Sequence, residues 1–260
     1  LASGGTAIIG MIHLRALPGS PGFGGSIQAV REAALADAQA LAEGGAHALM
    51  MENFFDTPFH PQRVPAEVIA HMTAIACEIR RTIGLPLGIN VLRNDGLSAL
   101  AVAHAGAAQF IRVNVLCGAR VADQGLIQGI AHDLLRLRSS LDAHVKILAD
   151  VDVKHSAPLA PRALADEIDD TIHRGLADAI IVSGAGTGKT TDPEKLKAAK
   201  AAAGPTPVLV GSGVTAQTAP AFLPHADGLI VGTALKRDGR VDQAIDPDRV
   251  RQLVRAVAAG

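Results

Sequence analysis

The sequence contains few aromatic residues: six Phe and no Trp or Tyr, which is 2% of its 260 residues. Interfaces built on aromatic anchors, platforms that stack nucleic-acid bases, and aromatic belts at membrane surfaces all require such side chains. The composition therefore argues against these three kinds of site. It also predicts a core made of aliphatic side chains and Ala.

Cysteine and long apolar runs are also scarce. Two cysteines, Cys77 and Cys117, cannot build a disulfide scaffold, and reduced thiols in a cytoplasmic protein are the simpler interpretation. Cys77 is flanked by Ile75, Ala76 and Ile79, so we expect it in the core. No apolar run approaches the length of a transmembrane helix, and no secretory leader is recognisable. These features predict a cytoplasmic protein that does not span a membrane.

The charge balance leaves no excess of either sign. Lys and Arg number 24 against 25 Asp and Glu, giving a formal net charge of -1. A nucleic-acid partner is therefore not expected, because nucleic-acid binders carry a basic surplus. Hydrophobic residues make up 48% and charged residues 19%, which excludes intrinsic disorder. A chain of this size buries about 70% of its unfolded surface, enough for one large core.

A two-part pattern repeats along the chain: a short apolar run, then an Ala-rich amphipathic segment, together spanning about 30 residues, the size of a βα unit. The apolar runs are rich in Ile, Val and Leu, which is typical of strands covered on both faces. Expected strands are Ala7–Leu14, Ala48–Glu52, Leu87–Val91, Phe110–Val115, Val145–Val151, Ala179–Val182, Val208–Val210 and Gly228–Val231. Expected helices are Ile27–Glu43, Ala66–Ile83, Gly96–His104, Leu126–Leu141, Arg162–His173, Asp192–Ala202, Ala216–Leu223 and Pro247–Ala258.

Eight such units predict an α/β fold: a single (β/α)8 TIM barrel formed by one domain over residues 1–260. No Pro- or Ser-rich linker divides the chain. A doubly wound open sheet is the alternative. In a barrel, functional groups lie at the carboxyl ends of the strands and in the loops that follow them.

Polar residues at these strand ends are the candidate site residues, because every second residue of a barrel strand points inward. The candidate catalytic residues are His13, Glu52, Arg112, Asp150, Asp152 and Lys154. The candidate substrate-binding residues in the same positions are Asn90, Arg93, Asn94, Asn114 and His155. Charged groups among barrel side chains destabilise the fold unless they are paired and hydrogen-bonded.

These residues have alternative interpretations. Arg112 and Asp150 could form a purely structural ion pair inside the barrel, or they could belong to a catalytic mouth. Carboxylates with a histidine also suit a divalent ion such as Mg²⁺, Mn²⁺ or Zn²⁺, although no metal-binding motif supports one and no cofactor is certain. Lys154 could form a Schiff base or abstract a proton if desolvation lowers its pKa, or it could simply pair with an anion.

Glycine-rich loops follow the seventh and eighth expected strands. Gly211, Ser212 and Gly213 follow the seventh, while Gly232 and Thr233 follow the eighth. Glycines let backbone N–H groups approach an anion, and this pair of loops forms the recurrent phosphate site of TIM barrels. The alternative is two tight turns without a ligand. Lys236 could add charge to the site or be solvated.

The loop after the sixth strand, residues 183–191, resembles a Walker A motif but has Ser183 where the motif needs its first Gly. We therefore do not expect an NTPase. A mobile lid is the preferred interpretation, in which Lys189 reaches an anionic ligand and Asp192 caps the next helix. A flexible surface loop is the alternative.

Segments spread over nearly the whole chain resemble the BtpA/SgcQ family. They are Gly10-Met11-Ile12-His13-Leu14, Leu17-Pro18-Gly19-Ser20-Pro21, Glu52-Asn53-Phe54, Asn90-Val91-Leu92-Arg93-Asn94-Asp95, Phe110-Ile111-Arg112-Val113-Asn114-Val115, Asp123-Gln124-Gly125-Leu126-Ile127 and Asp150-Val151-Asp152-Val153-Lys154-His155. The resemblance implies a barrel of the ribulose-phosphate-binding type but no settled reaction. Cyanobacterial members are associated with photosystem I stability at thylakoids. Other members accompany sugar-transport genes and are suspected enzymes.

Two functions follow from these observations. The first is an enzyme that binds a small phosphorylated, sugar- or nucleoside-like substrate, with lyase, isomerase and hydrolase chemistry all open. The second is a non-catalytic assembly or stability factor for photosystem I, or a scaffold, for which protein partners or a membrane surface would be needed. Ionisable residues in a barrel mouth favour the enzyme. The oligomeric state stays open, and a homo-oligomer is compatible with the sequence.

Overall fold

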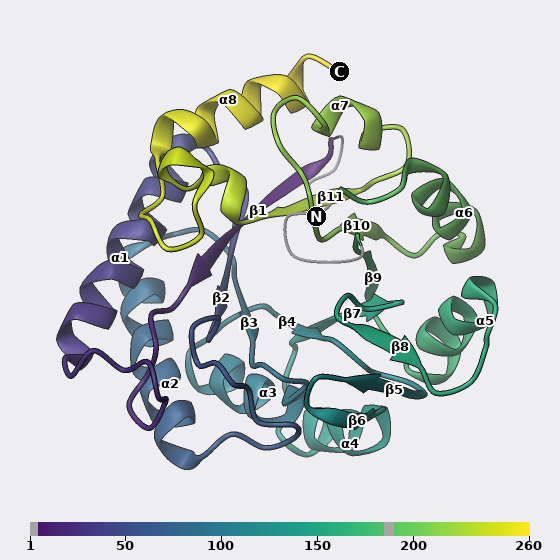
Figure 1. Ribbon diagram of the computed structural model, residues 1–260, viewed down its shortest axis with the longest axis horizontal. Helices are drawn as coiled ribbons and strands as arrows, with labels where there is room; N and C mark the ends of the chain where they lie inside the picture. Colours follow the sequence, from purple (N-terminus) through teal and green to yellow (C-terminus); the bar gives the residue numbers. More distant parts are fainter. Residues whose placement is uncertain (1–4, 185–189) are drawn as a thin grey trace.

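The computed structural model describes residues 5–184 and 190–260, and its centre is a closed barrel of parallel strands (Figure 1). In spatial order the strands are β1 (Ala7–His13), β2 (Ala48–Glu52), β3 (Leu87–Asn90), β4 (Phe110–Val113), β7 (Lys146–Val151), β9 (Ala179–Val182), β10 (Val208–Val210) and β11 (Gly228–Val231). β11 pairs with β1 from Ala7–Gly228 to Gly10–Val231, which closes the barrel. The predicted (β/α)8 barrel is therefore confirmed, and the open sheet is excluded.

Helices surround the barrel on its outer side (Figure 1). They are α1 (Ile27–Gly44), α2 (Ala66–Thr82), α3 (Gly96–Ala105), α4 (Ala131–Ser140), α5 (Leu164–Asp169), α6 (Pro193–Ala203), α7 (Ala219–Phe222) and α8 (Pro247–Ala258). A π-helical turn, η1 (Asp170–Arg174), continues α5, and two 3₁₀ turns, η2 (Thr233–Leu235) and η3 (Arg237–Gly239), follow β11. As predicted, Asp192 caps α6, because its side chain accepts a hydrogen bond from the Glu194 N–H.

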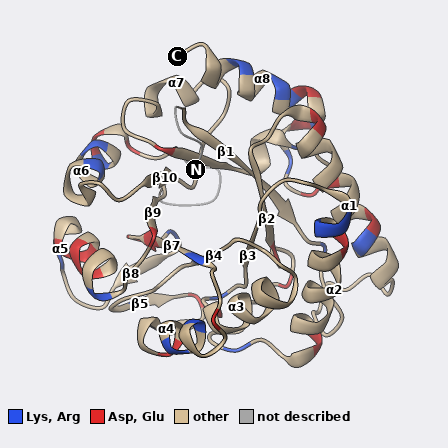
Figure 2. Ribbon diagram, turned by 180° about the vertical axis from the view of Figure 1, so that it is seen from behind, with Lys and Arg blue, Asp and Glu red and all other residues tan. Residues whose placement is uncertain are grey.

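Two apolar layers hold this arrangement together. The barrel interior is filled by aliphatic side chains and one Phe: Ile9, Met11, Ala48, Met50, Phe110, Leu148, Ala179, Ile181, Leu209 and Ile230. A second, larger layer packs the outer strand faces against the helices. Basic and acidic residues occur together on outer helices such as α1, α4 and α8 (Figure 2). The aliphatic core expected from the lack of aromatics is therefore present.

The predicted helix Leu126–Leu141 is wrong in its first part. Residues 119–128 form a hairpin of β5 (Ala119–Ala122) and β6 (Gly125–Gln128), which joins β8 (Ser156–Pro158) in an antiparallel sheet. Gly125 has a φ of 94°, which suits the tight turn and breaks a helix. The helix therefore begins only at Ala131, after Ile130.

Two further expectations need correction. The helix expected over Ala216–Leu223 is limited to Ala219–Phe222, because Thr215 and Thr218 form a turn by bonding each other's side chain and N–H. Cys77 is exposed, not in the core, because the buried face of α2 is formed by neighbours such as Ile75 and Ala76.

Within the described part of the chain, no helix combines the length and the apolar character needed to cross a bilayer.

Candidate functional site

Four polar residues form one row at the carboxyl end of the barrel. Strand register pairs His13 of β1 with Glu52 of β2, Glu52 with Asn90 of β3, and Asn90 with Arg112 of β4. Because residues in register on neighbouring strands point to the same side of a sheet, the four side chains form a polar layer above the apolar interior. The sequence analysis also placed these residues at the strand ends, from the rule that every second residue of a barrel strand points inward.

Arg112 and Asp150 form a buried ion pair in this layer. Arg112 donates from Nε and Nη2 to the two Asp150 oxygens at 2.9 and 2.7 Å, and the Asn114 amide adds a third bond at 2.7 Å. Burial alone would lower the pKa of Arg112, but the charges of Asp150 and Glu52 outweigh it and raise the pKa. The Asp150 carboxylate thereby accepts three hydrogen bonds from Arg112 and Asn114, while Arg112 also lines the cavity described below.

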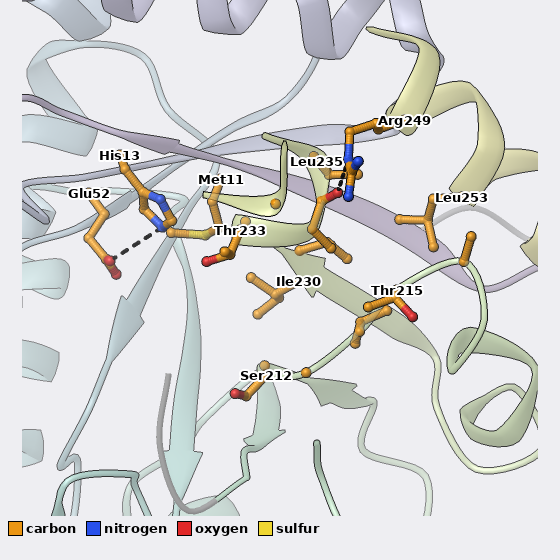
Figure 3. A pocket seen from close by; sticks show the side chains of 18 of the residues that line it. Met11, His13, Glu52, Ser212, Thr215, Ile230, Thr233, Leu235, Arg249 and Leu253 are labelled. Carbon is orange, nitrogen blue, oxygen red and sulfur yellow. Dashed lines mark hydrogen bonds and ion pairs between the residues drawn. The ribbon is translucent and has the colours of Figure 1, made fainter. Parts of the chain in front are cut away.

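Glu52 and His13 lie side by side (Figure 3). The Asn90 amide donates to Glu52 Oε2, and Glu52 Oε1 lies 3.9 Å from His13 Nε2. The Phe54 ring packs on the imidazole with centroids 4.4 Å apart. Burial, together with the positive charges of Lys236 and Lys154, lowers the pKa of His13 to about 3, and its buried Nδ1 has no hydrogen-bond partner in the part of the chain that the structure describes. His13 is therefore a neutral imidazole at physiological pH.

Lys154, in the loop after β7, is a further ionisable group of this region. Arg93 Nη2 donates to the Lys154 carbonyl at 2.8 Å and so fixes this loop. Burial and the nearby charge of Arg112 lower the pKa of the Lys154 amine, against the opposing effects of Glu52 and Asp150. The amine forms no hydrogen bond or ion pair with any residue that the structure describes.

These groups open into one cavity of about 370 Å³. Nine of the sequence-predicted residues line it: His13, Glu52, Arg112, Lys154, Gly211, Ser212, Gly213, Gly232 and Thr233. The cavity therefore joins the ionisable residues at the ends of β1, β2 and β4 and in the loop after β7 to the glycine-rich loops after β10 and β11. Its wall continues over Ile230, Leu235 and Leu253 (Figure 3).

The two glycine-rich loops have backbone requirements that only glycine meets. Gly213 has a φ of 68°, and a Cβ at Gly232 would come within 2.6 Å of His13 Cε1. The N–H of Gly211 is occupied, since it donates to the Val182 carbonyl. Among the described residues, no partner is found for the N–H groups of Gly213, Gly232 and Thr233. Gly213, Gly232 and Thr233 all line the cavity.

Other predicted residues lie behind or outside the cavity. Asn90, Arg93, Asn114 and Asp150 support the lining residues through the bonds given above. Asn94 holds the backbone of Val115, and Asp152 turns away at a φ of 47° to pair with Arg120 and Lys195, both at 2.6 Å. His155 is exposed, and Lys189 lies outside the described residues. Lys236 is neither solvated nor part of the lining, because it pairs with buried Asp37 at 2.6 Å.

The sequence reasoning missed the outer end of the cavity. Gln217 lies in the loop after β10, and Arg249 and Gln252 come from α8, far from any predicted strand end. Arg249 Nε donates to the Ala234 carbonyl at 2.8 Å, which fixes the side chain against η2 (Figure 3). No group of three His, Cys, Asp or Glu side chains within residues 5–184 and 190–260 is placed to hold a metal ion.

The fold and the site define a (β/α)8-barrel protein with a polar cavity at the carboxyl ends of its strands. The chain belongs to the BtpA family, whose model matches residues 5–259. It is 49% identical to the photosystem I biogenesis protein BtpA of Synechocystis over 97% of this chain and 88% of that protein. It is 33% identical to the sgc region protein SgcQ of Escherichia coli over 96% of this chain and 94% of the other.

Solved structures show the same fold at low identity. N-(5'-phosphoribosyl)anthranilate isomerase from Pyrococcus furiosus superimposes with a TM-score of 0.62 at 14% identity, covering 98% of this chain and all of that one. A tryptophan synthase from M. tuberculosis gives a TM-score of 0.62 at 18% identity, over 98% and 94% of the two chains. Both similarities concern the barrel architecture.

Proposed function

We propose that the protein is an enzyme that binds a small phosphorylated substrate at the carboxyl face of the barrel. One observation carries the proposal: the cavity is lined both by residues whose backbone N–H groups have no partner within residues 5–184 and 190–260 and by the ionisable residues His13, Glu52, Arg112 and Lys154 at the strand ends. The N–H groups of Gly213, Gly232 and Thr233 would bind the phosphate, because amides grouped in glycine-rich loops favour a dianion. The substrate would extend from there toward Glu52 and Lys154.

The ionisable groups suit acid–base chemistry on the rest of the substrate. Glu52 is oriented by Asn90 and supplies a carboxylate to accept or return a proton. Neutral His13 can polarise a substrate oxygen without carrying a charge of its own, and Arg112 stabilises negative charge. The same set serves isomerases, lyases and hydrolases, so the proposal covers a class of substrates and no single reaction.

A thermal-unfolding series tests this function. We expect inorganic phosphate and ribose 5-phosphate to raise the Tm, and ribose to leave it unchanged. A ligand at a hundred times its Kd stabilises a protein by about 2.7 kcal/mol. Thr233→Val removes one hydroxyl at the cavity and should weaken phosphate binding by about tenfold or more, since a hydrogen bond to a charged group is worth ~1.5–3 kcal/mol.

Thr206→Val is the matched control, because Thr206 precedes β10 at the opposite end of the barrel. It should bind phosphate like the unchanged protein. Equal Tm values with and without every phosphorylated compound would refute the proposal.

A non-catalytic role in the assembly of a larger complex is the second candidate. Two observations favour it: the name of the Synechocystis relative, and three exposed apolar side chains on the small sheet and just beyond it. Val121, Leu126 and Leu159 are 46%, 45% and 62% exposed, and Val121 and Leu126 are paired across β5 and β6. This role predicts that substitutions such as Leu126→Ser disturb assembly and that phosphate has no effect.

A further inference from the structure

Lys154 differs from the other lysines of this chain in its surroundings. The sequence has seven lysines, and six of them are described. Four are held by carboxylates: Lys146 by Asp178, Lys195 by Asp152, Lys200 by Asp227 and Lys236 by Asp37. Lys197 is exposed on α6. Lys154 is the described lysine that lines the cavity and has no carboxylate partner within ion-pair distance.

Burial is the largest influence that disfavours an ammonium ion at Lys154, and the charged groups around it act in both directions. Arg112 from β4 and Arg93 from the loop after β3 both add positive charge, while Glu52 of β2 and Asp150 of β7 oppose them. Asp150 is already bound by Arg112 and Asn114, and Glu52 by Asn90, so neither carboxylate is committed to the lysine. His13 of β1, which also lies in range of the Lys154 charge, is neutral. An amine without an ion-pair partner at this position does not stabilise the fold.

We propose that Lys154 forms an imine with the carbonyl group of a phosphorylated aldehyde or ketone. The inference rests on the proposed function, because the phosphate would be held by the loops after β10 and β11 while the carbonyl reaches the amine. It narrows the substrate class from phosphorylated compounds in general to those with a free carbonyl. A neutral amine is the nucleophile that such a reaction requires.

The chemistry balances with water as the only other product. The Nζ lone pair attacks the carbonyl carbon, the C=O π electrons move to oxygen, and a proton passes from nitrogen to oxygen to give a carbinolamine. The C–O bond then breaks, the oxygen leaves as water with a second proton from nitrogen, and the C=N bond forms. Glu52 lines the same cavity and can carry these protons, so it would be a catalytic residue together with Lys154.

Reductive trapping tests the imine. The protein is incubated with dihydroxyacetone phosphate or with dihydroxyacetone, sodium borohydride is added, and the modified residue is located by peptide mass spectrometry. Borohydride delivers a hydride to the imine carbon and leaves a stable secondary amine. We expect one saturable adduct on Lys154, formed at a concentration at least tenfold lower with the phosphorylated compound.

Three variants control for structure and for surface labelling. Lys154→Arg keeps the positive charge but removes the nucleophile, so its cavity should stay unlabelled while the Tm shift with inorganic phosphate persists. Lys197→Arg should label at Lys154 like the unchanged protein. Lys154→Met should not lower the Tm of the unliganded protein, whereas a structural role for the lysine would lower it.

The outcomes separate the two proposals. Labelling confined to Lys197 and other surface lysines, or equal labelling in Lys154→Arg, would overturn the imine and leave phosphate binding intact. An adduct on Lys154 with equal concentration dependence for both compounds would support the imine and contradict the phosphate site.

Discussion

His13 shows at the scale of one residue how the fold sets the chemistry of the site. The imidazole is enclosed by Phe54, by the close approach of Gly232 and by neighbouring positive charge, so it stays neutral in the folded protein. In the unfolded chain the histidine has an ordinary pKa near 6.5. Between pH 6.5 and about 3, only the unfolded chain therefore holds the proton.

This difference makes stability depend on pH with a defined sign. The unfolded state binds more protons below pH 6.5, so the free energy of unfolding falls as the pH is lowered through that window. Between pH 7.5 and 5.0, His13 should account for a loss of ~2 kcal/mol, from about 1.4 kcal/mol for each pH unit below 6.5. Urea unfolding of the unchanged protein and of His13→Gln measures it, and the variant should lack this part of the loss.

His132→Gln, at an exposed position, is the matched control and should behave like the unchanged protein. If His13→Gln lost as much stability as the unchanged protein over the same interval, the neutral, enclosed imidazole would be contradicted.

At the scale of elements, one arginine connects the small antiparallel sheet to the barrel. Arg120 of β5 is buried and donates to Ser156 at the start of β8 and to Asp152 in the loop after β7, both at 2.6 Å. It also reaches Glu167 of α5 at 3.4 Å. The loop that carries Lys154 is therefore held from two sides, by Arg93 and by this network.

Removing this arginine should destabilise the protein. Arg120→Met leaves Glu167 half-buried without its cation, while Asp152 keeps Lys195, so we expect a loss of ~1–3 kcal/mol, below that of a fully buried pair. Arg240→Met, which breaks an exposed pair with Asp242, should cost much less, because solvent screens exposed pairs. Urea unfolding compares them, and equal losses would show that the network does not hold the sheet.

The elements were predictable where burial imposes a pattern and less so elsewhere. The eight barrel strands are covered on both faces, which leaves continuous apolar runs in the sequence, and all eight were identified. The hairpin of β5 and β6 is short and partly exposed, so its apolar residues are too few to distinguish it from a helix start. The turn Asp123-Gln124-Gly125 was the local signal that could have revealed it.

The sequence could predict those site residues that lie on regular barrel strands, and it could not predict those beyond the strand ends. The alternation of side chains along the strands correctly placed His13, Glu52 and Arg112 together, because these residues still follow the register of the barrel. It failed for Asp152, where the chain has left β7 and a positive φ reverses the side chain. Arg249 could not be found, because its approach to the cavity depends on how α8 packs against η2.

At the scale of the whole molecule, closure of the barrel brings together groups from opposite ends of the chain. β1 and β11 are neighbours, so His13 lies against Gly232, while Lys154 and Arg112 reach the same cavity from the other side. An open sheet would separate β1 from β11 and divide the cavity. Its position at the carboxyl ends of the strands is the place where barrels of this kind carry their functional groups.

The most direct test of the proposed function is to locate phosphate on the protein by NMR. Backbone amide shifts of the ¹⁵N-labelled protein would be followed during titration with inorganic phosphate. We predict that the largest saturable changes occur at Gly213, Gly232 and Thr233, while Gly84 and Gly204, which precede β3 and β10 at the other end of the barrel, do not move. Changes confined to that opposite end, or none at any of these amides, would contradict a phosphate site in the cavity.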